Sequence, residues 1–194
     1  MNFLCHFALE SPDPQRVLGQ FLGDFARGPL TDLPYPPGVI AGIAAHRRLD
    51  AISGQHTLLR MAKDCLAARE RRFAGIVLDL YCDTLLMAHW PDLLQEDPDP
   101  FFLRIERVLR VPSCPLPPAA AHFAQRMLDH DLLRAYADVN ELPEILDRMG
   151  SRLRQPSRLS PLLLRLRQKE DRFLRAFPAF FGDLQQSMFP PCAF

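Results

Sequence analysis

Prolines lie at most of the breaks in the hydrophobic pattern of this chain. Nineteen prolines but only nine glycines occur in 194 residues, and the prolines gather in short groups such as 34–37, 98–100 and 112–118. Between these groups apolar residues recur at helical spacing, and the alternation typical of strands is hard to find. The sequence therefore predicts an all-α fold, in which the later helices include residues 118–136 and 160–187, the last of them bent at Pro178. We expect one compact helical domain over residues 1–194, because a chain with 48% hydrophobic residues can bury a sizeable core.

The helix expected at residues 38–51 carries ionisable groups on its apolar face. At ~100° per residue, His46 and Asp50 fall on the same face as the apolar residues that begin with Val39. Burying a lone carboxylate is costly, so Asp50 needs a charged partner, several hydrogen-bond donors or a metal ion. We expect the neighbouring segments to supply that partner.

Further ionisable residues lie on or near apolar helix faces in the first 90 residues, and they are His6, Asp24, Asp79 and Asp83. Imidazole and carboxylate ligands without thiolate spacing suit Mn²⁺, Fe²⁺, Mg²⁺ or Zn²⁺, and such ions can activate water for attack on phosphorus. The alternative interpretation treats each group separately, as a core histidine with an ordinary partner or an aspartate that pairs with Arg47 or Arg48.

Charge and composition exclude several classes of protein. The formal net charge is zero, so no overall field draws the chain to nucleic acid or to a membrane. Five cysteines without CxxC spacing indicate reduced thiols. The first residues lack a signal-peptide pattern, and no apolar run approaches the ~20 residues of a membrane span. We therefore expect a cytoplasmic protein, whose oligomeric state the sequence leaves open.

Several of these residues stand in a pattern that resembles the acyl carrier protein phosphodiesterase family, a group regarded as divergent all-helical relatives of the HD-domain phosphohydrolases. The matching pieces occur in order and with the right spacing: MNFLCH at 1–6, GDF at 23–25, GIAAHRRLD at 42–50 and LDLYCD at 78–83. Weaker agreement continues through MGSR at 149–152 and the last long helix. The resemblance thus covers nearly the whole chain.

The resemblance implies a function and a set of site residues. Members of the family remove 4′-phosphopantetheine from holo-acyl carrier protein with the help of a divalent cation, typically Mn²⁺, with Mg²⁺ or Fe²⁺ as alternatives. When the family's site is carried over to the matching positions of this chain, the resemblance implies that the metal ligands or their near neighbours are His6, Asp24, His46, Asp50 and Asp83. Asp24 would be indispensable for catalysis, and Arg47 would steady the phosphate oxygens.

Two positions depart from the family pattern. Thr84 stands where the family usually has histidine, and Gly54 stands where it tends to have aspartate. A threonine hydroxyl is a weak ligand and no base near pH 7. Two alternatives to the phosphodiesterase therefore stay open: a catalytically weakened or inactive member that binds a carrier protein, and a metal phosphohydrolase for another phosphoester.

The densest basic segment is a candidate for binding the carrier. Residues 150–175 hold eight basic residues against two acidic ones. Carrier proteins of this type are acidic, so we expect docking on this segment, with Arg165 and Arg167 among the contacts. The alternative is a solvated helix face whose arginines pair with carboxylates elsewhere.

Overall fold

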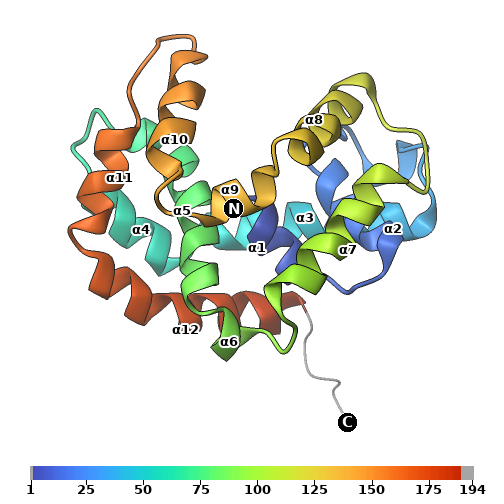
Figure 1. The fold of residues 1–194 in the computed structure, drawn as a ribbon, viewed down its shortest axis with the longest axis horizontal. Helices are drawn as coiled ribbons and strands as arrows, with labels where there is room; N and C mark the ends of the chain where they lie inside the picture. Colours follow the sequence, from blue (N-terminus) through green and yellow to red (C-terminus); the bar gives the residue numbers. More distant parts are fainter. Residues whose placement is uncertain (1, 189–194) are drawn as a thin grey trace.

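The computed structural model describes residues 2–188, and every regular element in that range is a helix (Figure 1). The all-α prediction is confirmed. None of the helices in this range combines the length and the apolar character that a membrane span requires. In chain order the α-helices are α1 (Phe3–Ala8), α2 (Pro14–Leu22), α3 (Pro37–Ser53), α4 (Thr57–Asp64), α5 (Ala74–Ala88), α6 (Trp90–Leu93), α7 (Pro98–Arg110), α8 (Pro118–Asp129), α9 (Leu132–Ala137), α10 (Leu142–Ser151), α11 (Ser160–Arg167) and α12 (Glu170–Met188), with short 3₁₀ turns at Leu30–Asp32 and Arg71–Phe73.

Many of the prolines mark helix starts. Proline occupies the first turn of α2, α3, α6, α7, α8, α10 and α11. Proline suits this position because the N–H groups of the first turn have no partner within the helix. At α2 the Asp13 side chain adds a cap, accepting hydrogen bonds from the backbone N–H groups of Gln15 and Arg16 at 3.0 Å each.

Two long helices expected from the sequence are each divided in two. The helix expected at 118–136 breaks at Asp131, whose φ of 44° is left-handed, and α8 and α9 form in its place. The helix expected at 160–187 is interrupted at residues 168–169, which gives α11 and α12. The bend expected at Pro178 does not end α12, which continues past that residue to Met188.

Helices α2 and α3 pack with their backbones in direct contact. A Cβ atom placed on Gly42 would lie 2.1 Å from the Arg16 carbonyl oxygen, and one on Gly19 would lie 2.2 Å from the Val39 carbonyl oxygen. Only glycine fits at these two positions. Because of this approach, the end of α2 lies beside the second half of α3, where His46 and Asp50 are found.

Helix α1 lies near the centre of the molecule, in contact with α2, α5 and α9 (Figure 1). It is only six residues long, but its Phe3, Leu4, Cys5, His6 and Phe7 are all buried. One cluster of buried apolar side chains joins α1 to the rest of the described chain. The imidazole of His6 is therefore held inside the hydrophobic core and not on a mobile terminus.

The close approach of α2 and α3 predicts that an alanine at Gly42 lowers the free energy of unfolding. Gly42→Ala should lower the free energy of unfolding by about 1–3 kcal/mol, because the new methyl group forces the helices apart. The matched control is Gly182→Ala in α12, where an added Cβ meets nothing within 4 Å. That variant should be as stable as the parent protein or more so, by up to ~1 kcal/mol, since alanine is the better helix former. Urea denaturation measures both; equal stability of the two variants would contradict the packing described.

Candidate metal centre

Two buried histidines from different helices stack on each other. The rings of His6 and His46 lie 4.0 Å apart between centroids, with an interplanar angle of 13°. Asp50 joins them, because its Oδ1 lies 3.1 Å from His6 Nε2 and its Oδ2 lies 3.2 Å from His46 Nε2. The helical spacing of His46 and Asp50 thus places both side chains on one face of α3, where α1 supplies the second imidazole.

Asp24 completes the cluster from the end of α2. Its Oδ1 lies 3.4 Å from His46 Nε2. The preceding residue, Gly23, makes room for the histidine: a Cβ atom at that position would lie only 2.1 Å from His46 Cγ. The two imidazoles are buried, whereas the side chains of Asp24 and Asp50 are 53% and 46% exposed. The cluster therefore has an apolar base and an open carboxylate edge.

A buried glutamine fixes the orientation and the tautomer of His6. Gln20 Nε2 donates to Glu10 Oε2 at 3.0 Å, and Glu10 also accepts from Arg16 Nε at 2.7 Å. An ionised carboxylate only accepts hydrogen bonds, so the Gln20 amide must present its carbonyl oxygen to His6. His6 Nδ1, 3.1 Å from that oxygen, is then the donor. In the neutral ring this leaves a lone pair on Nε2, directed at Asp50.

This arrangement matches the requirements of a cation. Burial alone would raise the pKa of Asp50, but the hydrogen bond from His46 Nε2 opposes this, and the pKa lies well below its ordinary value, so the carboxylate is ionised. Burial lowers the pKa of His6 in spite of its contact with Asp50. His6 Nε2 and Asp50 Oδ1 are therefore two acceptors facing each other at 3.1 Å. A positive charge between them satisfies both.

Of the two imidazoles, that of His46 is the one that stays protonated. Burial alone would lower the pKa of His46, but hydrogen bonds to Asp24 and Asp50 outweigh it and raise the pKa to about 9. Its other nitrogen, Nδ1, is buried and has no hydrogen-bond partner among the described residues. A divalent ion in the cluster would take the place of this proton at Nε2.

The donor set fits a divalent metal ion. One nitrogen from each of His6 and His46 and one oxygen of Asp50 lie within 4.8 Å of one another. Neutral imidazole and carboxylate are ligands for Mn²⁺, Fe²⁺ and Zn²⁺, and the Gln20 contact to His6 is the kind of outer-shell hydrogen bond that ligating histidines use. Asp24 lies at the same nitrogen of His46 and can add a fourth ligand or hold a water molecule.

The structure does not bring Asp83 into this cluster. Its carboxylate is fully buried at the start of α1: Oδ2 accepts from Asn2 Nδ2 at 2.7 Å and from the Leu4 N–H at 3.4 Å, and Oδ1 accepts from the Cys5 N–H at 3.1 Å. Burial raises the pKa of Asp83 to about 7 against these three hydrogen bonds. Both oxygens thus cap the helix that carries His6, and the contacts support a positioning role.

Arg47 also has protein partners. Its Nη1 donates to the Gly28 carbonyl oxygen and its Nη2 to the Ala26 carbonyl oxygen, each at 2.8 Å. These bonds tie the guanidinium to the loop that follows Asp24.

The positions that depart from the family pattern lie outside the cluster. The Thr84 hydroxyl donates to the Tyr81 carbonyl oxygen of its own helix at 2.9 Å. Gly54 is exposed at the C-terminal end of α3. His56, two residues further along, caps α4 and contacts Asp183 of α12 at 3.1 Å.

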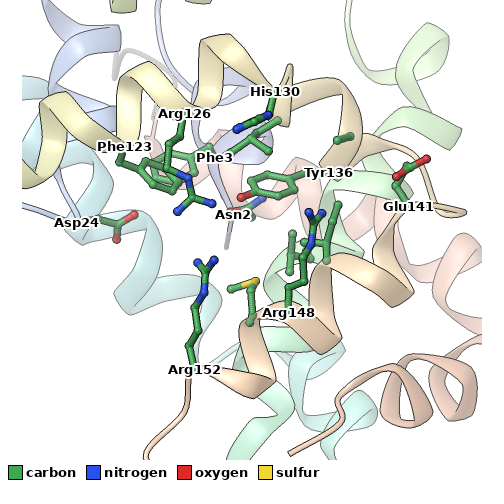
Figure 2. Close-up of a pocket in the computed structure, with 15 residues that line it drawn as sticks. Asn2, Phe3, Asp24, Phe123, Arg126, His130, Tyr136, Glu141, Arg148 and Arg152 are labelled. Atoms are coloured by element: carbon green, nitrogen blue, oxygen red, sulfur yellow. The ribbon is translucent and has the colours of Figure 1, made fainter. Parts of the chain in front are cut away.

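A cavity of about 680 Å³ adjoins the cluster at Asp24. Figure 2 shows it between α8 and α10, with Asn2 and Phe3 of the N-terminal segment and Tyr136 of α9 on its walls. Its volume lies in the ~300–1,000 Å³ range of small-molecule sites. Asp24 therefore borders a space that can hold a substrate.

Sequence reasoning missed several residues of this region. Gln20 lies at the margin of the apolar stripe of its helix, a position that is normally solvated. Nothing in the sequence indicates that Gly23 packs against the imidazole ring of His46. Arg126 and Arg148 lie on helices far along the chain that carry no other site signal. A glutamine three residues before GDF is the one feature that could have been noticed.

Fold and site define an all-helical protein with a histidine–aspartate cluster of the kind that binds divalent metals. Comparison with known proteins gives the family: the family model described as acyl carrier protein phosphodiesterase matches residues 1–184. The chain belongs to the acyl carrier protein phosphodiesterase family. No solved structure matches it significantly, so the expected likeness to HD-domain phosphohydrolases stays a prediction.

Curated relatives carry the same family name. A protein named acyl carrier protein phosphodiesterase from Yersinia pestis is 31% identical over 191 residues, covering 95% of this chain and 98% of the relative. Relatives of that name from Yersinia enterocolitica and Escherichia coli are 32% and 31% identical, each covering 78% of this chain and 79% of the relative.

The Gln20 contact predicts a loss of metal affinity when it is removed. Gln20→Leu keeps the side chain's approximate size but takes away the acceptor for His6 Nδ1. We expect the Kd for Mn²⁺ to rise by ~10-fold or more, as for other outer-shell partners of ligating histidines. Gln15→Leu on the same helix is the control and should leave the Kd unchanged. Isothermal titration calorimetry measures both, and an unaltered Kd in Gln20→Leu would mean that His6 needs no orienting partner.

The capping role of Asp83 predicts a stability change that does not depend on metal. Asp83→Asn puts an amide N–H₂ against backbone N–H donors, so the free energy of unfolding should fall by about 1–3 kcal/mol, the cost of a buried donor without its acceptor. The measurement is urea denaturation in excess EDTA. A residue that served only as a metal ligand would give no loss under these conditions.

Proposed function

We propose that this protein is a divalent-metal-dependent phosphodiesterase that removes 4′-phosphopantetheine from holo-acyl carrier protein and leaves the apo form. The observation that carries the proposal is the cluster of His6, His46, Asp50 and Asp24 beside a substrate-sized cavity, in a chain of the acyl carrier protein phosphodiesterase family. The substrate is taken from the name of the family and of its curated members.

The residues of the cluster would have different roles in such a reaction. His6, His46 and Asp50 would hold the ion, which we propose to be Mn²⁺, with Mg²⁺ or Fe²⁺ as alternatives. A bound ion of this kind polarises the phosphoryl oxygens and lowers the pKa of water. Asp24 is partly exposed on the cavity wall, where its carboxylate can orient the attacking water and accept its proton.

Neighbouring residues keep this arrangement in place before substrate binds. Gln20 orients His6, and Asp83 holds the N-terminal end of the helix that carries it. Arg47 fixes the loop after Asp24, so we assign it a positioning role in place of direct contact with phosphate. The reacting groups are thus held by buried hydrogen bonds, which reduces the reorganisation needed in the transition state.

A second candidate is a catalytically weakened or inactive member of the family that binds the carrier protein. The departures at Thr84 and Gly54 favour it, since neither residue offers a ligand or a base. The cluster itself, however, contains none of the departures. For either candidate a cytoplasmic setting is suitable, because the four described cysteines are free thiols; Cys192 lies outside the described residues.

The direct test is hydrolysis of holo-acyl carrier protein. Incubation with Mn²⁺ should yield the apo-carrier and free 4′-phosphopantetheine, both detected by mass spectrometry, and EDTA should stop the reaction. Asp50→Asn should lower the rate by more than the ~10–100-fold that loss of an outer-shell partner costs. Asp64→Asn, on the exposed side of α4, is the matched control and should keep the parent rate.

Two outcomes would contradict the proposal in different ways. If holo-carrier binds but is not hydrolysed in the presence of Mn²⁺, Mg²⁺ or Fe²⁺, so that it retains its 4′-phosphopantetheine group, the second candidate is favoured. Full activity in Asp50→Asn would show that the reaction does not use this cluster.

A further inference from the structure

The cavity beside the cluster is lined by both aromatic and charged side chains. Asp24 marks the end that adjoins the histidines, while Phe3, Phe123 and Tyr136 supply apolar surface. Three arginines line the same space: Arg126 of α8, and Arg148 and Arg152 from the C-terminal end of α10. Figure 2 shows their guanidinium groups turned toward one another across the cavity, with Asp24 at its edge.

These arginines lack the carboxylate partners that arginines usually have. Among residues 2–188, no carboxylate lies within ion-pair distance of Arg126 or Arg152, and Arg148 makes only a long, exposed contact of 3.9 Å with Glu144. The other carboxylate in the lining, Glu141, points away from the three guanidinium groups in Figure 2. Three like charges that share a concave site repel one another unless an anion lies between them.

The three charges act on one point of the cavity. Burial raises the pKa of Tyr136, and Arg126, Arg148 and Arg152 each oppose that rise. Their positive charges therefore act on the same phenol on the cavity wall, although Arg126 comes from α8 and the other two come from the end of α10.

Part of the basic segment singled out in the sequence is engaged in ion pairs. Arg165 pairs with Glu70, Arg167 with Glu170 and Arg158 with Asp147. Arg152 is the member of the segment that lines the cavity, and its position there beside Arg126 and Arg148 distinguishes it from the other basic residues of the segment.

We propose that Arg126, Arg148 and Arg152 bind the phosphate of the 4′-phosphopantetheine group next to Asp24, while the aromatic wall contacts the aliphatic part of its arm. This inference rests on the proposed function and adds the substrate-binding residues to it. Arginine suits the task because its planar guanidinium donates two parallel hydrogen bonds to phosphate oxygens. The arginines would also fix the phosphorus beside the carboxylate edge of the cluster.

The shape of the site favours a phosphate group over the acidic surface of a carrier protein. The charges line a cavity and are mixed with buried aromatic rings, of which Phe3 and Tyr136 are 7% and 9% exposed. A helix of a carrier protein needs a broad accessible face, whereas a narrow arm with a charged end fits a concave site with apolar walls and a few polar groups.

The test is binding of 4′-phosphopantetheine, the reaction product, which gives a signal without turnover. Isothermal titration calorimetry in Mn²⁺ buffer compares it with pantetheine, which lacks the phosphate. Arg126→Ala and Arg152→Ala should each weaken binding of 4′-phosphopantetheine by roughly 10- to 100-fold, the loss of hydrogen bonds to a charged group. Binding of pantetheine should stay the same. Arg175→Ala, an exposed residue of α12 outside the cavity, is the control and should change neither.

The arms of the experiment separate this inference from the proposed function. Hydrolysis of holo-carrier by the parent protein, together with unchanged 4′-phosphopantetheine binding in both arginine variants, overturns the inference alone. If 4′-phosphopantetheine binding depends on the arginines but the parent protein does not hydrolyse holo-carrier, the inference is supported and the proposed function is contradicted. Weaker binding of the apo-carrier, with unchanged binding of 4′-phosphopantetheine, would make these residues a docking surface for an acidic protein and would also overturn the inference.

Discussion

Direct backbone contact between α2 and α3 is the constraint on which the candidate centre depends. Gly19 and Gly42 let the two helices approach until a carbonyl oxygen of each lies where the other's Cβ would be. One turn further along, Gly23 leaves the space that the ring of His46 fills. A side chain at any of these positions would move Asp24 away from His46. The glycines therefore determine the geometry of a site to which they contribute no functional group.

Charge compensation around Asp50 explains why its neighbours are polar in an apolar core. Asp50 faces two stacked imidazoles with one oxygen each, and one of those rings is held as an acceptor by Gln20. The second carboxylate, Asp24, and the raised pKa of His46 show that the cluster keeps a positive charge among its acidic groups. At the other end of α1, Asp83 receives the first N–H groups of the helix. The hydrogen bonds of these groups organise the site before any ligand binds.

The sequence predicted the helical architecture and one face of the centre, but not the partners of each residue. Helical periodicity placed His46 and Asp50 together because i,i+4 neighbours share a face whatever surrounds them. The same reasoning put Asp83 on an apolar face, yet it could not reveal that the start of α1 would occupy both carboxylate oxygens. The break at Asp131 depends on a single left-handed residue. The convergence of Arg126 with Arg152 comes from the packing of α8, α9 and α10, which no local pattern encodes.

The central claim is that His6, His46 and Asp50 form a metal centre, and a crystal structure grown with Mn²⁺ tests it most directly. The account predicts one anomalous peak between the three side chains, at ligand distances of roughly 2.0–2.3 Å from the two Nε2 atoms and a carboxylate oxygen of Asp50. It also predicts that Asp83 keeps its bonds to α1 in that structure. An Mn²⁺ bound at any other group of residues, with His6 still in contact with Asp50, would contradict the claim.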